Sequence, residues 1–164
     1  MWDNLITMVG TLVATLSGCL LTGMAQARVA RSERRETRWD ARRSEALAAV
    51  TALVSALADH RRAMWVLEDL QLSHADSAVV AGALEASHVT RSALTAPLTT
   101  IRILIPALAG PARQATQATY VMRNAPDHAT LETLRQEALN ASDRLEEAAA
   151  ELFAAVGGVL EVAT

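Results

Sequence analysis

The sequence contains no lysine, a single cysteine and few residues that interrupt helices. Its 164 residues include seven glycines and four prolines, and only 3% are aromatic. Because Cys19 has no second cysteine in the chain, an intrachain disulfide framework is excluded. Hydrophobic residues make up 51% of the chain and are mainly Ala, Leu and Val, a mixture that favours helices over sheets. The composition therefore predicts an all-α protein.

The sequence also lacks the residue spacings that mark catalytic, metal and nucleotide sites. It has no HExxH, CxxC or EF-hand pattern and no glycine-rich phosphate loop. The acid pairs Glu68–Asp69 and Glu146–Glu147 are direct neighbours, so on a helix their side chains point to different faces. We therefore expect a non-enzymatic protein with no metal and no cofactor.

The first long feature is an uncharged, largely apolar stretch over residues 5–24. At a rise of ~1.5 Å per residue, such a helix spans roughly 30 Å, the thickness of the hydrocarbon core of a bilayer. Trp2 lies where an interfacial aromatic anchor is expected. The stretch predicts a single transmembrane helix in contact with membrane lipids.

The residues after this stretch are strongly basic, with seven arginines against three acids in residues 28–43. The positive-inside rule then places residues 1–4 outside the cell (inner) membrane and the bulk of the chain in the cytoplasm. The basic juxtamembrane set is Arg28, Arg31, Arg35, Arg38, Arg42 and Arg43. Its outer members, together with Trp39, are far enough from the lipid to contact an acidic protein or DNA phosphates. Direct DNA binding by a membrane-tethered module therefore stays an open alternative.

Two export signals can also be proposed for the same region. Residues 16–19 have the form of a lipobox, with Cys19 as a lipidated first residue, and residues 25–27 have the form of a signal-peptidase site. Either would give an exported or lipid-anchored helical envelope protein. Both signals need a basic n-region, whereas residues 1–4 carry only Asp3. A further alternative buries the stretch as part of a helical hairpin.

Small residues recur every fourth position within the predicted membrane helix. They are Gly10, Ala14, Gly18 and Thr22. Such a stripe lets two helix backbones approach closely in lipid. It therefore predicts a homo-oligomer.

The rest of the chain predicts a basic juxtamembrane helix over residues 25–45 and an antiparallel bundle of three or four helices over residues 46–164. The first helix is expected to continue to about residue 72, with an apolar stripe of Val50, Val54, Leu57, Met64 and Leu67. Asp76 or Ser77 is the expected N-cap of a second helix reaching about residue 105. Pro97 should kink or split that helix, with Thr95 capping the new start.

Two further helices are expected near the C-terminus. Pro106, Gly110 and Pro111 mark a break before a third helix over about residues 111–123. Asp127 can cap a last helix over about residues 128–156, which should end at the glycine pair 157–158.

A dense polar cluster interrupts the apolar stripe of the first helix. It consists of Asp59, His60, Arg61, Arg62 and Trp65. One interpretation is an ion pair between Asp59 and Arg62, which are three residues apart on one helix. The other is a partner-docking patch with Trp65 as its anchor and Arg61 at its rim.

Several strings of the sequence resemble one known family. They are the N-terminal MWDNLI, DHRRAMW at residues 59–65, TAPL at 95–98, IRILIP at 101–106 and YVMRNAPD at 120–127. Together with the single apolar span and the arginine-rich helix, they resemble the KilB-like proteins of Streptomyces. The resemblance implies a membrane protein that assists conjugative transfer or intramycelial spread of plasmid DNA, with other plasmid-transfer membrane proteins as partners.

Overall fold

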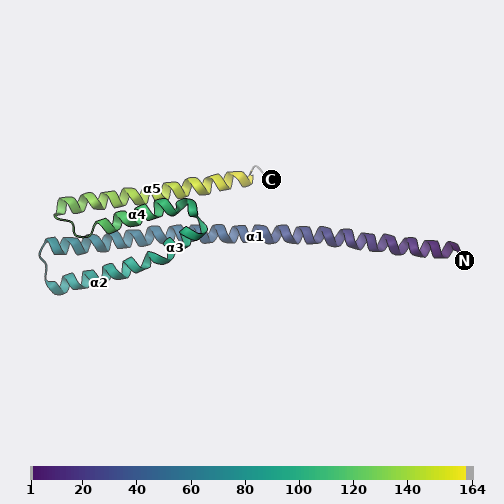
Figure 1. Cartoon of the computed structure of the whole chain (residues 1–164), viewed down its shortest axis with the longest axis horizontal. Helices are drawn as coiled ribbons and strands as arrows, with labels where there is room; N and C mark the ends of the chain where they lie inside the picture. Colours follow the sequence, from purple (N-terminus) through teal and green to yellow (C-terminus); the bar gives the residue numbers. More distant parts are fainter. Residues whose placement is uncertain (1, 162–164) are drawn as a thin grey trace. The chain divides into compact units, whose positions relative to one another are not determined.

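The computed structural model describes the backbone of residues 2–161 and the side chains of residues 37–155. All regular elements in this part of the chain are helices, and no strand occurs in it (Figure 1). The elements are α1 (Trp2–Leu72), α2 (Ser77–Ala93), α3 (Thr95–Leu104), the short 3₁₀ helix η1 (Pro106–Leu108), α4 (Ala109–Val121) and α5 (His128–Glu161). The predicted all-α class is confirmed.

The chain divides into two units, residues 1–43 and residues 44–164. The first unit is the N-terminal part of α1. Among the residues that the structure describes, no helix is both long and apolar enough to cross a lipid bilayer. The predicted membrane segment, residues 5–24, with its small-residue stripe, lies outside the described side chains.

The second unit is a helical bundle built on the C-terminal part of α1. Helices α2 and α3 run back along one side of this part, and α4 and α5 lie on its other side (Figure 1). One core cluster joins fully buried leucines and isoleucines of α1, α3 and α5, including Leu57, Ile101 and Leu145. A second cluster joins Met64 of α1 to Met122 and Leu131 near the α4–α5 connection.

The apolar stripe predicted in the first helix faces this core. Val50, Leu57, Met64 and Leu67 are buried, and Val54 is half-buried. Their spacing of three, four and seven residues keeps them on one side of a 3.6-residue helix. Leu53, which the predicted stripe omitted, lies on the same side and is fully buried.

The predicted breaks at Asp76 and Pro97 both occur. The Asp76 carboxylate accepts a hydrogen bond from the Ala78 N–H at 2.8 Å, which confirms it as the cap of α2. α2 ends at Ala93 and α3 begins at Thr95, so the helix splits before the proline. Proline has no N–H to donate to the carbonyl four residues earlier, and its ring crowds that carbonyl. The prediction that Thr95 caps α3 is wrong. Leu94 occupies the N-cap position of α3, and its side chain makes no capping hydrogen bond.

The last helix begins as predicted but ends later. The Thr130 N–H donates to the Asp127 carboxylate at 2.7 Å, which confirms Asp127 as the cap of α5. The predicted end at residues 157–158 is wrong, since α5 continues to Glu161. Glycine disfavours a helix interior by only about 1 kcal/mol relative to alanine, so it does not by itself stop a helix.

Candidate functional site

The polar cluster of residues 59–65 does not share one environment. His60 points into the bundle and is 1% exposed, whereas Asp59 and Arg62 are exposed. Arg61 and Trp65, four residues apart on one helix face, are half-buried. Among the described contacts no ion pair joins Asp59 to Arg62, so the structure does not support the predicted intrahelical pair.

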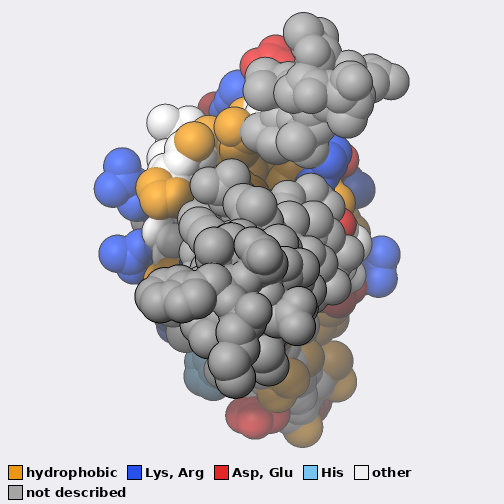
Figure 2. Space-filling model, turned by 90° about the vertical axis from the view of Figure 1, so that its right-hand side faces the viewer, with side chains coloured by type: hydrophobic (Ala, Val, Ile, Leu, Met, Phe, Trp, Pro, Cys, Tyr) orange, Lys and Arg blue, Asp and Glu red, His pale blue; other side chains and the backbone are white. Residues whose placement is uncertain are grey.

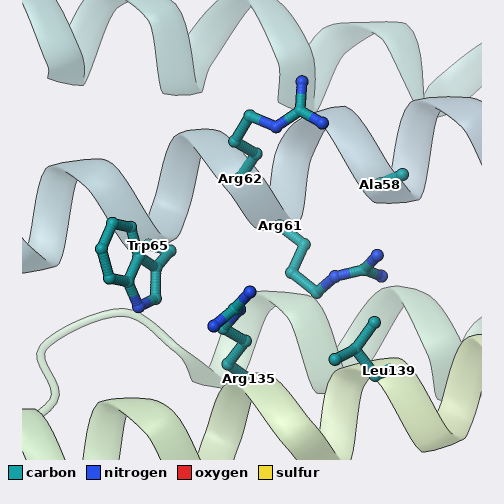
Figure 3. A pocket seen from close by; sticks show the side chains of 6 residues that line it. All are labelled: Ala58, Arg61, Arg62, Trp65, Arg135 and Leu139. Atoms are coloured by element: carbon teal, nitrogen blue, oxygen red, sulfur yellow. The ribbon is translucent and has the colours of Figure 1, made fainter.

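A pocket of about 220 Å³ lies between α1 and α5. It is lined by Ala58, Arg61, Arg62, Trp65, Arg135 and Leu139. Figure 3 shows Arg61 pointing from α1 toward α5, and Arg135 reaching from α5 into the space between Arg61 and Trp65. Arg62 extends from α1 away from α5 (Figure 3). The structure therefore brings three residues of the predicted patch together with an arginine from a distant part of the sequence.

The guanidinium of Arg135 contacts a carboxylate and an aromatic ring. Its Nη1 donates to both carboxylate oxygens of Glu132, one helical turn earlier, at 3.1 Å. Its guanidinium carbon lies 5.7 Å from the centre of the Trp65 ring, a cation–π arrangement. These contacts orient the Arg135 guanidinium at the edge of the pocket.

Arg61 has no carboxylate at ion-pair distance among the described contacts. Its Nη1 donates to the Ser142 hydroxyl at 3.4 Å. Partial burial lowers the pKa of Arg61, and the positive charges of Arg135 and Arg62 lower it further. Asp143 and Glu146 on α5 act in the opposite direction. Burial and the neighbouring arginines therefore both disfavour the positive charge of Arg61, and the two acids of α5 favour it.

His60 belongs to a separate polar cluster inside the bundle. Its Nδ1 lies 2.9 Å from the Thr90 hydroxyl, which itself donates to backbone carbonyls of α2. His60 Nδ1 and the Thr90 hydroxyl share one hydrogen bond, whose donor is set by the ring tautomer, and Nε2 finds no hydrogen-bond partner among the described residues. The ring meets Tyr120 edge-on at 5.6 Å, and Arg91 covers Tyr120 at 4.7 Å. Burial, helped by the charge of Arg91, lowers the pKa of His60 from 6.5 to about 4, so the imidazole is neutral at pH 7.

Glu68 is a buried carboxylate with a structural partner. It is 2% exposed and accepts a hydrogen bond from the backbone N–H of Asn124 at 3.0 Å. Burial raises the pKa of Glu68, while hydrogen bonds from the Asn124 and Ala125 N–H groups and the charge of Arg123 oppose that shift. This contact joins α1 to the α4–α5 connection.

The basic juxtamembrane set is only partly described. Arg38 and Arg42 are exposed and Arg43 is half-buried, whereas Arg28, Arg31 and Arg35 lie outside the described side chains. In the space-filling view of Figure 2, arginine side chains stand apart on both sides of the described surface.

Sequence reasoning missed Arg135 and the role of Glu68. Arg135 had only its position near Glu132 as a local signal, and that spacing predicts a solvated ion pair. Nothing local links Glu68 to Asn124, because 56 residues separate them. Among the described residues, no group of three or more His, Cys, Asp or Glu side chains is arranged to hold a metal ion.

Comparisons with known proteins match the part of the chain that carries these features to one family. The family described as KilB plasmid transfer protein matches residues 47–153, which include every residue of the pocket. Protein KilB of Streptomyces lividans is 50% identical over 151 residues, covering 90% of this chain and 100% of that relative. No solved structure matches the chain.

Proposed function

Because the chain belongs to the KilB plasmid transfer protein family, we propose that it assists plasmid transfer as a membrane-anchored, non-enzymatic helical scaffold. Its task would be the conjugative transfer of plasmid DNA or the spread of that DNA through the recipient mycelium. Other plasmid-transfer membrane proteins and further copies of the chain are the proposed partners.

The scaffold role is supported by how the bundle uses its buried ionisable groups. Among the described residues these are His60 and Glu68. Glu68 binds the backbone of the α4–α5 connection, and His60 packs between Thr90 and Tyr120. Catalytic sites place ionisable groups where a substrate can reach them. Both of these groups instead hold helices together, which is the observation that carries the proposal.

The membrane anchor rests on the sequence of residues 5–24 and on the arginines that follow. An uncharged stretch of this length suits one passage through a bilayer, and the arginines favour retention of the bundle in the cytoplasm. The stripe of Gly10, Ala14, Gly18 and Thr22 is the proposed contact between copies in the membrane.

Protease digestion of intact protoplasts tests the proposed topology. If the bundle is cytoplasmic, residues after Arg28 resist digestion until the membrane is permeabilised. Digestion in intact protoplasts would favour an exported protein. Mass spectrometry of the cellular protein gives a second readout, since a mature chain that begins at Cys19 or Arg28 contradicts the anchor.

A plasmid-transfer assay then connects the anchor to function. A Leu12→Arg substitution places a charge in the proposed span at a cost of about 2.5–3.5 kcal/mol at the bilayer centre. We expect it to release the protein from the membrane fraction and to lower plasmid transfer. Leu47→Arg is the matched control, because Leu47 lies in the bundle and is 43% exposed. Normal transfer by a protein released from the membrane would contradict the anchored scaffold.

A second candidate function, direct DNA binding, is favoured by the exposure of Arg38, Trp39 and Arg42, with Trp39 69% exposed. Phosphate contacts by arginine make affinity fall steeply with salt. If these residues bind DNA, replacing Arg38 and Arg42 by Gln in the detergent-solubilised full chain flattens the salt dependence. Absence of binding at low salt would remove this candidate.

A further inference from the structure

The pocket between α1 and α5 concentrates positive charge that the described residues only partly balance. Arg61 and Arg135 enter it from different helices, and Arg62 lies at its border. Among the described contacts, a single carboxylate lies at ion-pair distance from these arginines. It is that of Glu132, and it binds Arg135. Asp143 and Glu146 influence Arg61 from farther away.

The donor groups of the pocket also exceed their described acceptors. A guanidinium carries five N–H donors in a planar fork. In the described contacts Arg61 uses Nη1 toward Ser142, and Arg135 uses Nη1 toward Glu132. The Ser142 hydroxyl donates its own proton to the Ala138 carbonyl at 3.1 Å, and its oxygen accepts from Arg61. This oxygen is uncharged, so it does not balance the positive charge of Arg61. Further N–H groups of both arginines therefore remain for a ligand.

We propose that this pocket, formed by Arg61 and Arg135 beside Trp65, binds a phosphate group. Guanidinium forks match the oxygens of phosphate in paired hydrogen bonds. A phosphate group carries more charge and more acceptor oxygens than a carboxylate, so it can accept from forks on both helices. Trp65 holds the Arg135 guanidinium by its ring face, which orients one of the two forks before binding.

The size of the pocket suits a ligand of this class. Its volume of about 220 Å³ is far above the ~10–15 Å³ that a cavity needs to hold one water molecule. It is smaller than the ~300–1,000 Å³ of pockets that enclose drug-sized ligands. The site therefore admits free phosphate or the phosphate of an ester whose remaining part extends into solvent. This inference does not depend on the proposed scaffold function.

The emission of Trp65 provides a direct test in the detergent-solubilised full chain. Trp2→Phe and Trp39→Phe leave Trp65 as the sole tryptophan reporter. Inorganic phosphate is titrated at constant ionic strength, with chloride replacing it in the reference titration. We expect a saturable change in Trp65 emission with phosphate, and a dissociation constant at least tenfold higher in Arg61→Gln and in Arg135→Gln. Arg102→Gln, an exposed position on α3, should leave the dissociation constant unchanged.

Circular dichroism confirms that each variant is folded, and the two arginine variants test the site independently. A phosphate response no different from chloride overturns the proposal. Phosphate binding as tight as that of the wild type in the folded Arg61→Gln and Arg135→Gln variants also overturns it. Parallel titrations with methyl phosphate and acetate identify the ligand. Methyl phosphate as tight as inorganic phosphate assigns a phosphate ester, and weaker methyl phosphate assigns the free ion. Acetate that binds as tightly as phosphate overturns the assignment to phosphate.

Discussion

The side chain of Glu68 in α1 accepts a hydrogen bond from the backbone N–H of Asn124 at 3.0 Å, across 56 residues of sequence. Asn124 has a positive φ of 60°, a left-handed conformation that asparagine adopts more readily than most residues. The carboxylate thus satisfies a backbone donor in the sharp turn between α4 and α5. This one contact ties the turn to the helix on which the bundle is built.

Removing the Glu68 side chain should destabilise the bundle. Glu68→Ala leaves the Asn124 N–H without its described acceptor, and an unsatisfied buried polar group costs about 1–3 kcal/mol. We expect the free energy of unfolding to fall by about that amount in urea titrations at pH 7. Glu68→Gln is the matched control, since its side-chain carbonyl can still accept the hydrogen bond. Equal loss in both variants would show that the charge, rather than the acceptor, matters.

The raised pKa of Glu68 also predicts how the free energy of unfolding changes with pH. The folded-state pKa of Glu68 is raised, so the folded protein holds this proton more tightly than the unfolded chain does. The stabilising contribution is present below the unfolded pKa of 4.5 and is lost as pH rises through the folded pKa. Glu68→Gln should remove this part of the pH dependence. A wild-type and a Gln variant with parallel stability profiles above pH 4.5 would contradict the raised pKa.

The lowered pKa of His60 predicts that the protein loses stability as the pH falls, whereas the Glu68 contribution is lost as the pH rises. Its folded pKa of about 4 lies below the ordinary 6.5, so protonation favours the unfolded chain. The contribution of His60 is complete above pH 6.5 and is lost as pH falls from 6.5 through 4. At about 1.4 kcal/mol per pKa unit, the loss is at most about 3.5 kcal/mol.

Urea titrations between pH 7 and pH 4 measure this effect. His60→Gln should show a smaller loss of stability on acidification than the wild type, because glutamine does not titrate. His88→Gln is the matched control, since His88 is exposed on α2. If the two variants lose stability alike, the buried imidazole is not the group that senses pH.

The core around Leu57 predicts a cavity effect. Leu57 is fully buried against residues of several helices, so Leu57→Ala should lower the free energy of unfolding by about 2–5 kcal/mol. Leu47→Ala, at a position 43% exposed in the same helix, should lower it much less. Thermal unfolding of the two variants compares them directly. Similar melting temperatures would place Leu57 outside the cooperative core.

The proposed self-association predicts the behaviour of the single cysteine. Copies that meet along Gly10, Ala14, Gly18 and Thr22 bring Cys19 of one copy near Cys19 of the other, and oxidation should then yield a disulfide-linked dimer. Gly18→Ile places a branched side chain on the stripe and should abolish the cross-link in membranes. Leu20→Ile is the control, because position 20 lies on the opposite side of such a helix. Unchanged cross-linking in Gly18→Ile would argue against this contact.

Much of the helical organisation could be predicted, because its signals act over a few residues. Asp76 and Asp127 cap the helices that follow them, and Pro97 splits α2 from α3 through its missing N–H. The errors are local as well. The sequence predicts Thr95 as the cap of α3 and the glycine pair 157–158 as the end of α5, and both predictions are wrong because neither residue type compels a helix boundary.

The candidate pocket could be predicted only in part. Arg61, Arg62 and Trp65 are visible as one cluster in the sequence, but their neighbour Arg135 lies some seventy residues away. Helical periodicity places His60, three residues after Leu57 and four before Met64, on the apolar face of α1, and it turns Arg61 away from that face. Which helix packs against each face depends on the tertiary structure.

By itself, the sequence determined the helical class, most helix boundaries, the family and the apolar face of α1, because composition, caps, proline and periodicity act within a few turns of chain. The tertiary structure decided that Glu68 holds the turn at Asn124, that His60 is buried beside Tyr120, and that Arg61 faces Arg135 across a pocket. These pairings join residues from different helices. They follow from the close packing of complementary side chains, for which a linear sequence carries no local signal.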